Sequence, residues 1–276
     1  MSGAPETAPP PVRCGIGGIG LLGPGLAGWA ASEAVLAGMA PWQEAAPAVP
    51  PPAMLAPAER RRASLVVRLA LAAAGEAVAG SGLAPEALDT VFASSNGDGA
   101  VVGAILDALA TPGGDVSPTL FHNSVHNAAA GYWGIGAGSM RPSVSLGCHD
   151  DTFPLGLLQA ATGVAAWGRP VLFCAYDAPL NPPLDACRPT AVPFALAMLL
   201  LPEGADGARA TLGLRHRPEA PATEAAPRSA LRTTLEEANP AARALPLLEA
   251  LAARKPARLA WPLLDGMGLE AELSPC

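Results

Sequence analysis

The stretch NAAAGYWGIGAGSMRPSVSLGCHDDTFPLGLLQAA, residues 127–161, decides the fold of this chain. It begins inside an alanine- and glycine-rich helix predicted over residues 121–137. It then passes through a short strand at 143–146 and a Gly-Cys-His-Asp turn, and it ends in a second helix predicted at 151–167. A strand that lies between two helices in this way is typical of α/β proteins.

The same alternation continues in both directions from this stretch. Further strands are predicted at 12–19, 90–94, 171–176 and 194–201, and further helices at 26–37, 58–79, 101–110 and 245–253. The sequence therefore predicts an α/β fold. After about residue 205 the pattern is weak, and the stretch 217–229 is rich in proline, alanine and glutamate.

Length and composition set the organisation and limit the partners. The 276 residues, half of them hydrophobic, suffice for a sizeable core, and we expect a flexible tail at 1–11 followed by a single domain at 12–276. Only 15% of residues are charged and the net charge is −7, so there is no basic field to hold nucleic acid.

The cysteines and the first residues predict a cytoplasmic protein. The five cysteines are an odd number without a CxxC pair, which does not suit a disulfide framework. The N-terminal segment lacks the basic start and compact apolar stretch of a signal peptide. The uncharged segment 15–31 holds too many glycines to make a good spanning helix, so no membrane span is expected.

Three local motifs could carry chemistry, and the first is glycine-rich. Gly15-Ile-Gly-Gly-Ile-Gly20 matches G-x-G-x-x-G directly after a predicted strand, as in dinucleotide-binding folds. Such folds also need a second strand that ends in an acidic residue about 20 residues further on. A helix and a proline-rich loop occupy that place here, so no cofactor is expected.

The second motif is a pair of histidines. His122 and His126 are four residues apart and would share one face of a helix, and Asp150 or Asp151 could supply a carboxylate to complete a metal site. A metal-dependent hydrolase is therefore one reading. The other is that both histidines are hydrogen-bonded in the packed interior.

The third motif is Cys148-His149-Asp150, between a strand and a helix. A thiol near a helix N-terminus has its thiolate stabilised by the helix dipole, so Cys148 is a candidate nucleophile with His149 or His126 as its base. Asp150 and Asp151 also suit the start of a helix, where each would accept backbone N–H bonds.

The central block resembles that of the β-ketoacyl synthases. In that family an asparagine, two glycines, a proline, an alternating strand, Thr-Ala-Cys and a helix with paired alanines follow one another. The positions that fit this frame without a gap are Asn127, Gly131, Gly138, Pro142 and Ala160-Ala161. Counting along the frame places Cys148 at the threonine, His149 at the alanine and Asp150 at the nucleophilic cysteine.

The resemblance implies a thiolase-like fold, of which this chain would keep the N-terminal half, a mixed sheet with helices on its faces. Coverage is about residues 12–205. The second half of a condensing enzyme supplies two histidines and a lysine, whereas this chain offers only His216 and Lys255 after Asp150.

With an acid at the nucleophile position, the resemblance implies a catalytically silent partner. Members of the family that lack the cysteine, called chain-length factors, pair with an active ketosynthase, and short members occur in aryl-polyene and related polyketide pathways. We therefore expect a heterodimer with a full-length β-ketoacyl synthase, formed across the strand at 143–146, and only an indirect link to an acyl carrier protein. The alternatives are an acyltransferase that uses Cys148 and the metal-dependent hydrolase.

Overall fold

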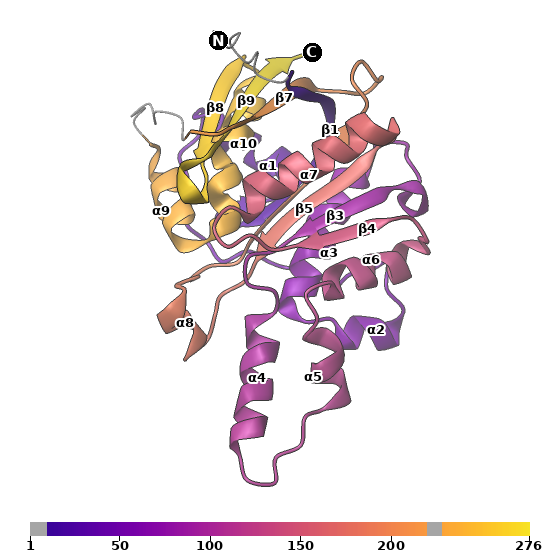
Figure 1. Cartoon of the computed structure of the whole chain (residues 1–276), viewed down its shortest axis with the longest axis vertical. Coiled ribbons are helices and arrows are strands. Elements are labelled where there is room, and N and C mark those ends of the chain that lie inside the picture. Colours follow the sequence, from indigo (N-terminus) through magenta and orange to yellow (C-terminus); the bar gives the residue numbers. More distant parts are fainter. Residues whose placement is uncertain (1–9, 220–227) are drawn as a thin grey trace, which may run out of the picture.

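One mixed sheet forms the centre of the structure, a computed structural model that describes residues 10–219 and 228–276 (Figure 1). Its strands follow the order β4-β3-β5-β6-β1-β7-β9-β8, and β2 pairs with β1. The β3 strand is parallel to both β4 and β5, and the other described pairings are antiparallel. The strands are β1 (Val12–Gly23), β2 (Leu26–Ala27), β3 (Asp89–Ala93), β4 (Ser143–Leu146), β5 (Val171–Asp177), β6 (Phe194–Leu201), β7 (Ala210–Arg217), β8 (Ala257–Pro262) and β9 (Gly268–Pro275).

Helices pack on both faces of this sheet and bury two apolar clusters. Side chains of α3 and α6 pack on one face, and side chains of α1, α7, α9 and α10 pack on the other. The α4 and α5 helices project from the body as a hairpin (Figure 1). The helices are α1 (Trp29–Leu36), α2 (Pro57–Arg62), α3 (Leu65–Val78), α4 (Gly99–Ala110), α5 (Pro118–Asn123), α6 (Ala128–Ala137), α7 (Thr152–Trp167), α8 (Leu184–Cys187), α9 (Ala230–Ala238) and α10 (Leu245–Ala253).

The predicted α/β class is confirmed, and most differences concern helix boundaries. The helix predicted at 58–79 is two helices, because Ser64 begins a new one and accepts a hydrogen bond from the Val67 N–H at 3.4 Å. The helix predicted at 121–137 is likewise divided, between α5 and α6. The first residues of the helix predicted at 26–37 form β2 instead.

The part of the chain after residue 205, in which the sequence pattern is weak, extends the same sheet. Strand β7 pairs with β1, and β9 lies between β7 and β8. The tail predicted at 1–11 lies outside the described residues up to residue 9, and most of the stretch 217–229 lies outside them as well. That residues 12–276 form a single domain stays a prediction, supported by this continuous sheet.

The glycine motif lies within β1 and serves close packing. A Cβ atom at Gly18 would lie 1.8 Å from the carbonyl oxygen of Ala77, and one at Gly20 would lie 2.0 Å from that of Ala73. Both alanines belong to α3. These glycines therefore let the backbone of α3 approach β1, and they do not form a phosphate-binding turn before a helix.

A buried carboxylate ties the ends of β3 and β5 together. Asp177, the last residue of β5, accepts hydrogen bonds from the Ser94 hydroxyl at 2.8 Å, from the Asn96 N–H at 2.9 Å and from the Ser95 N–H at 3.2 Å. Burial raises the pKa of Asp177 to about 6, although these hydrogen bonds and the charge of Arg188 act in the opposite direction.

No helix in the described part of the chain combines the length and the apolar character needed to span a membrane.

Replacing Gly18 or Gly20 by alanine is expected to lower the free energy of unfolding by about 1–3 kcal/mol, because the new methyl group would push α3 away from β1. Urea denaturation followed by circular dichroism measures this loss. Gly75→Ala is the matched control, since no atom lies within 4 Å of a Cβ there, and it is expected to stabilise α3 by about 0.5–1 kcal/mol. Equal losses in all three variants would contradict the packing argument.

The contribution of Asp177 to stability is expected to fall as the pH rises from about 4 to about 6. In this range the native carboxyl, with its pKa raised from 3.8 to about 6, keeps a proton that the unfolded chain has lost. The shift corresponds to a loss of about 3 kcal/mol. Urea denaturation at several pH values, for the native chain and for Asp177→Asn, measures the difference.

Asp107→Asn, at an exposed position on α4, is the control for this pH series. A difference between the native chain and Asp177→Asn that does not change with pH would refute the raised pKa.

Candidate functional site

The turn between β4 and α7 carries the cysteine, histidine and aspartates that the sequence singles out. Its backbone is closed by Thr152, whose hydroxyl accepts a hydrogen bond from the Cys148 N–H at 2.8 Å and donates one to the His149 carbonyl at 2.6 Å. His149 has a φ of 52°, a left-handed conformation that is uncommon for a residue with a side chain. Such conformations concentrate at functional sites.

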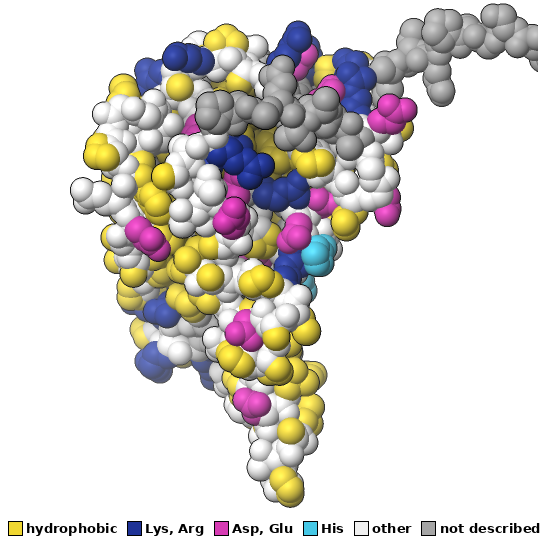
Figure 2. All heavy atoms as spheres, turned by 90° about the vertical axis from the view of Figure 1, so that its left-hand side faces the viewer, with side chains coloured by type: hydrophobic (Ala, Val, Ile, Leu, Met, Phe, Trp, Pro, Cys, Tyr) yellow, Lys and Arg dark blue, Asp and Glu magenta, His cyan; other side chains and the backbone are white. Residues whose placement is uncertain are grey.

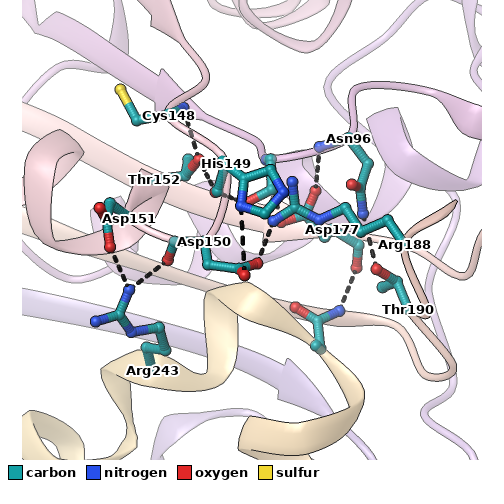
Figure 3. Close-up of polar contacts among 12 residues, drawn as sticks. Asn96, Cys148, His149, Asp150, Asp151, Thr152, Asp177, Arg188, Thr190 and Arg243 are labelled. Carbon is teal, nitrogen blue, oxygen red and sulfur yellow. Dashed lines mark hydrogen bonds and ion pairs between the residues drawn. The ribbon is translucent and has the colours of Figure 1, made fainter. Parts of the chain in front are cut away.

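Asp150 has its carboxylate engaged on both oxygens. One oxygen pairs with Nη2 of Arg188, and the other lies 3.3 Å from Nδ1 of His149 (Figure 3). Because the Asp150 side chain is 57% exposed, solvent weakens these pairs and they add little stability. Their effect is to orient a carboxylate between a cation and an imidazole.

Asp151 is buried and joins the turn to the C-terminal part of the chain. Its oxygens accept hydrogen bonds from Nη1 of Arg243 and from the N–H of Leu264, both at 2.7 Å. The same Arg243 nitrogen also donates to the Asp150 carbonyl at 2.7 Å (Figure 3). The expectation that Asp151 caps α7 is wrong, because its side chain forms no capping bond although the residue occupies the N-cap position. The Asp150 carboxylate likewise pairs with Arg188 and His149 instead of with helix N–H groups.

The thiol of Cys148 is poorly prepared to act as a nucleophile. Burial, and then the charge of Asp151, raise its pKa and so favour the protonated form. Its sulfur points away from the His149 ring (Figure 3). The other candidate base, His126, donates from Nε2 to the Ser94 carbonyl at 2.8 Å. Among the described residues, the thiol forms no hydrogen bond with either imidazole.

The two histidines of the proposed metal site do not share a helix face. His122 lies on α5, which ends at Asn123, and His126 follows in the segment before α6. His122 packs edge-on against Tyr132, with ring centroids 5.8 Å apart. Both histidines are exposed, so the alternative of a packed interior pair is wrong as well. Within residues 10–219 and 228–276, no three His, Cys, Asp or Glu side chains are placed to hold a metal ion.

The loop after β3 completes the site with residues that the sequence interpretation did not single out. The Ser95 hydroxyl donates to the His149 carbonyl at 2.7 Å, and the Asn96 amide donates to the Thr190 hydroxyl at 2.9 Å. Asp177 holds this loop in place through the hydrogen bonds that it accepts from Ser94, Ser95 and Asn96. The signals in the sequence were slight: a strand ending in Ser-Asn-Gly-Asp-Gly, and an arginine in Cys-Arg-Pro at 187–189.

The histidine and the lysine that follow Asp150 in the sequence, His216 and Lys255, lie elsewhere in the fold. His216 belongs to β7, and Lys255 follows α10. Among the described residues, neither forms a hydrogen bond or ion pair with Asp150, whose side-chain partners are Arg188 and His149.

Comparison with solved structures gives the fold a family context. The ketosynthase ApeO in complex with its chain length factor ApeC, from Xenorhabdus doucetiae, matches with a TM-score of 0.69 at 21% identity, over 94% of this chain and 99% of that chain. The ishigamide ketosynthase/chain length factor matches with a TM-score of 0.72 at 16% identity, over 95% and 99%. A β-ketoacyl synthase from Burkholderia phymatum matches with a TM-score of 0.65 at 13% identity, over 95% and 100%.

At these identities the likeness concerns the fold, and it confirms the thiolase-like α/β class expected from the sequence. No curated protein sequence matches the chain. The family model described as "Beta-ketoacyl synthase, N-terminal domain" matches residues 29–262, which is most of the chain and includes the turn that carries Asp150. The chain therefore belongs to the β-ketoacyl synthase family, through that family's N-terminal domain.

Proposed function

We propose that this protein is a noncatalytic, chain-length-factor-like partner of an active β-ketoacyl synthase in polyketide or fatty-acid-like synthesis. The observation that carries the proposal is that the carboxylate of Asp150, the residue that the sequence frame assigns to the nucleophile position, is engaged by Arg188 and His149. The ApeO and ishigamide structures support it, since each contains a protein described as a chain length factor. Aryl-polyene synthesis is the kind of pathway that we expect for it.

The chemistry of condensation explains why the carboxylate points to a silent partner. Carbon–carbon bond formation of the Claisen type needs a thiolate that carries the acyl group, and donors that stabilise the enolate and its oxyanion. A carboxylate is a poor acyl carrier, and its negative charge would repel a malonyl carboxylate. Cys148 does not compensate, because its raised pKa favours the neutral thiol.

A surface suited to the synthase lies along β4 and α6, and we call these two elements with residues 138–142 the β4 face. β4 is an edge strand of the sheet and pairs only with β3 among the described strands. Beside it runs a groove of about 740 Å³, lined by residues that include Ile135, Met140 and Ser145. An open strand edge beside a groove suits the addition of a strand from a partner.

Exposed apolar side chains continue from the β4 face onto the projecting hairpin. Ile135 is 57% exposed and Met140 is 98% exposed, while Leu109 on α4 and Phe121 on α5 are 67% and 69% exposed. Figure 2 shows hydrophobic side chains gathered along the projection. A partner that covers both regions would bury this apolar surface, which is costly to leave in water.

The acyl carrier protein is expected to reach this protein only through the synthase.

A cytoplasmic location also remains a proposal, supported by the five cysteines, all of which are free thiols.

The purified protein alone is expected to form no acyl-enzyme. After incubation with an acyl carrier thioester, intact-mass spectrometry should show the unmodified mass, whereas an active synthase treated in the same way should gain the acyl group. A stoichiometric adduct that disappears in Cys148→Ala would overturn the proposal in favour of the acyltransferase reading.

Co-expression with a full-length synthase from the same pathway is expected to give a one-to-one complex by size exclusion with light scattering, whereas the protein alone should be polydisperse. Ile135→Asp should break the complex by placing a charge on the β4 face. A charge at Val144 is less informative, because Val144 packs against the core and the fold would suffer too.

Met39→Asp is the control for the complex, since Met39 is 76% exposed and lies after α1, outside the β4 face. A soluble monomer that ignores the synthase, or equal effects of the two substitutions, would end the heterodimer hypothesis.

A further inference from the structure

Residues 180–190, which lie between β5 and β6, form a loop that is closed at its base, and we call this segment the strap. The Leu180 N–H donates to the Thr190 carbonyl at 3.0 Å and so brings the two ends of the strap together. The short helix α8 lies in its middle, and Figure 1 shows α8 standing out from the sheet and from the helices that cover it. Loops whose ends lie close together in this way are compact units that are frequently functional.

Apolar packing contributes little to holding the strap in place. None of its residues belongs to either of the two apolar clusters in the described part of the chain. Most of residues 181–189 are exposed, whereas Thr190 at the end of the strap is buried. At the other end Leu180 packs against α4, where a Cβ atom at Gly99 would lie 2.1 Å from its Cδ2. Segments with few buried apolar contacts open at a lower free-energy cost than the whole fold.

The middle of the strap is tied to the rest of the protein through Arg188. Its Nη2 pairs with the Asp150 carboxylate, and Figure 3 shows this side chain reaching toward Asp150. The Arg188 side chain is 16% exposed, although that of Asp150 is 57% exposed. Arg188 also acts on Asp177, because its charge opposes the rise that burial causes in the pKa of that carboxyl. Among the described residues, the other side-chain hydrogen bond of the strap is at its end, from the Asn96 amide to the Thr190 hydroxyl.

We infer that the strap opens and closes against the turn between β4 and α7, and that the ion pair between Asp150 and Arg188 holds it closed. A partly exposed ion pair suits this role, because water replaces it at little cost in free energy. Opening removes the charge of Arg188 from both Asp150 and Asp177, so the strap controls access to these two carboxylates. The inference goes beyond the proposed function, since it concerns a motion of this protein by itself.

Hydrogen–deuterium exchange of the full chain, measured by mass spectrometry on peptides that cover residues 178–190, tests this motion. The amides of Leu180, Leu184 and Arg188 report it, because they donate to carbonyls within the strap. A single helical turn does not persist without support, so these bonds are lost when the strap opens. Asp150→Asn keeps the shape and removes the charge, and it should speed exchange of these amides about threefold, the effect of losing a partly exposed ion pair. Peptides from β5 and β6 should exchange as in the native chain.

Asp107→Asn is the matched control, because it removes the same charge from an exposed position on α4 and should leave exchange of the strap unchanged. Raising the NaCl concentration from about 0.05 M to about 1 M should speed exchange in the native chain and in Asp107→Asn, but not in Asp150→Asn, since salt screens an ion pair. Adding Asp150→Asn to Arg188→Gln should give no further increase, because the first substitution has already removed the pair.

Three results would overturn the inference. The first is a strap that exchanges in Asp150→Asn as it does in the native chain. The second is an equal effect of salt on these two proteins. The third is an equal acceleration in the β5 and β6 peptides, which would mean that the substitution loosens the whole fold instead of the strap.

Discussion

The hydrogen bonds that Asp177 accepts from the loop after β3 are the interaction on which the site depends. These hydrogen bonds hold residues 94–96 at the carboxyl ends of the parallel strands β3 and β5. From this loop the Ser95 hydroxyl reaches the His149 carbonyl and so positions the turn that carries Asp150. Burial of this carboxylate has an electrostatic cost, and its oxygens in return order the loop through these hydrogen bonds.

The sequence predicted what depends on local pattern. Period-two strands and helical stripes predicted the α/β order that the structure shows, whereas the assignment of Asp150 to the nucleophile position stays a prediction. Leu269, Ala271 and Leu273 alternate with more exposed residues in β9, but three alternating residues are too short a pattern to predict a strand by themselves. The local pattern could not show that the Asp151 side chain accepts a hydrogen bond from Arg243 instead of capping α7, since the two residues are 92 positions apart.

A glycine-rich motif such as residues 15–20 can have either of two structural roles. Glycines that bring a backbone close to a phosphate look the same in sequence as glycines that bring a helix close to a strand. Gly18 and Gly20 belong to the second kind, because the atoms they would strike are α3 carbonyls. The close approach of α3 to β1 therefore depends on Gly18 and Gly20 and not on any residue of the Asp150 turn.

The hydrogen bonds that Asp151 accepts from Arg243 and Leu264 also affect the order in which the protein folds. During synthesis the turn 147–151 leaves the ribosome well before Arg243 and Leu264, whose contacts with Asp151 span 92 and 113 positions. Long-range contacts of this kind form late, because a long loop must close before they can stabilise the structure. The turn between β4 and α7 is therefore expected to be among the last parts of this protein to become rigid.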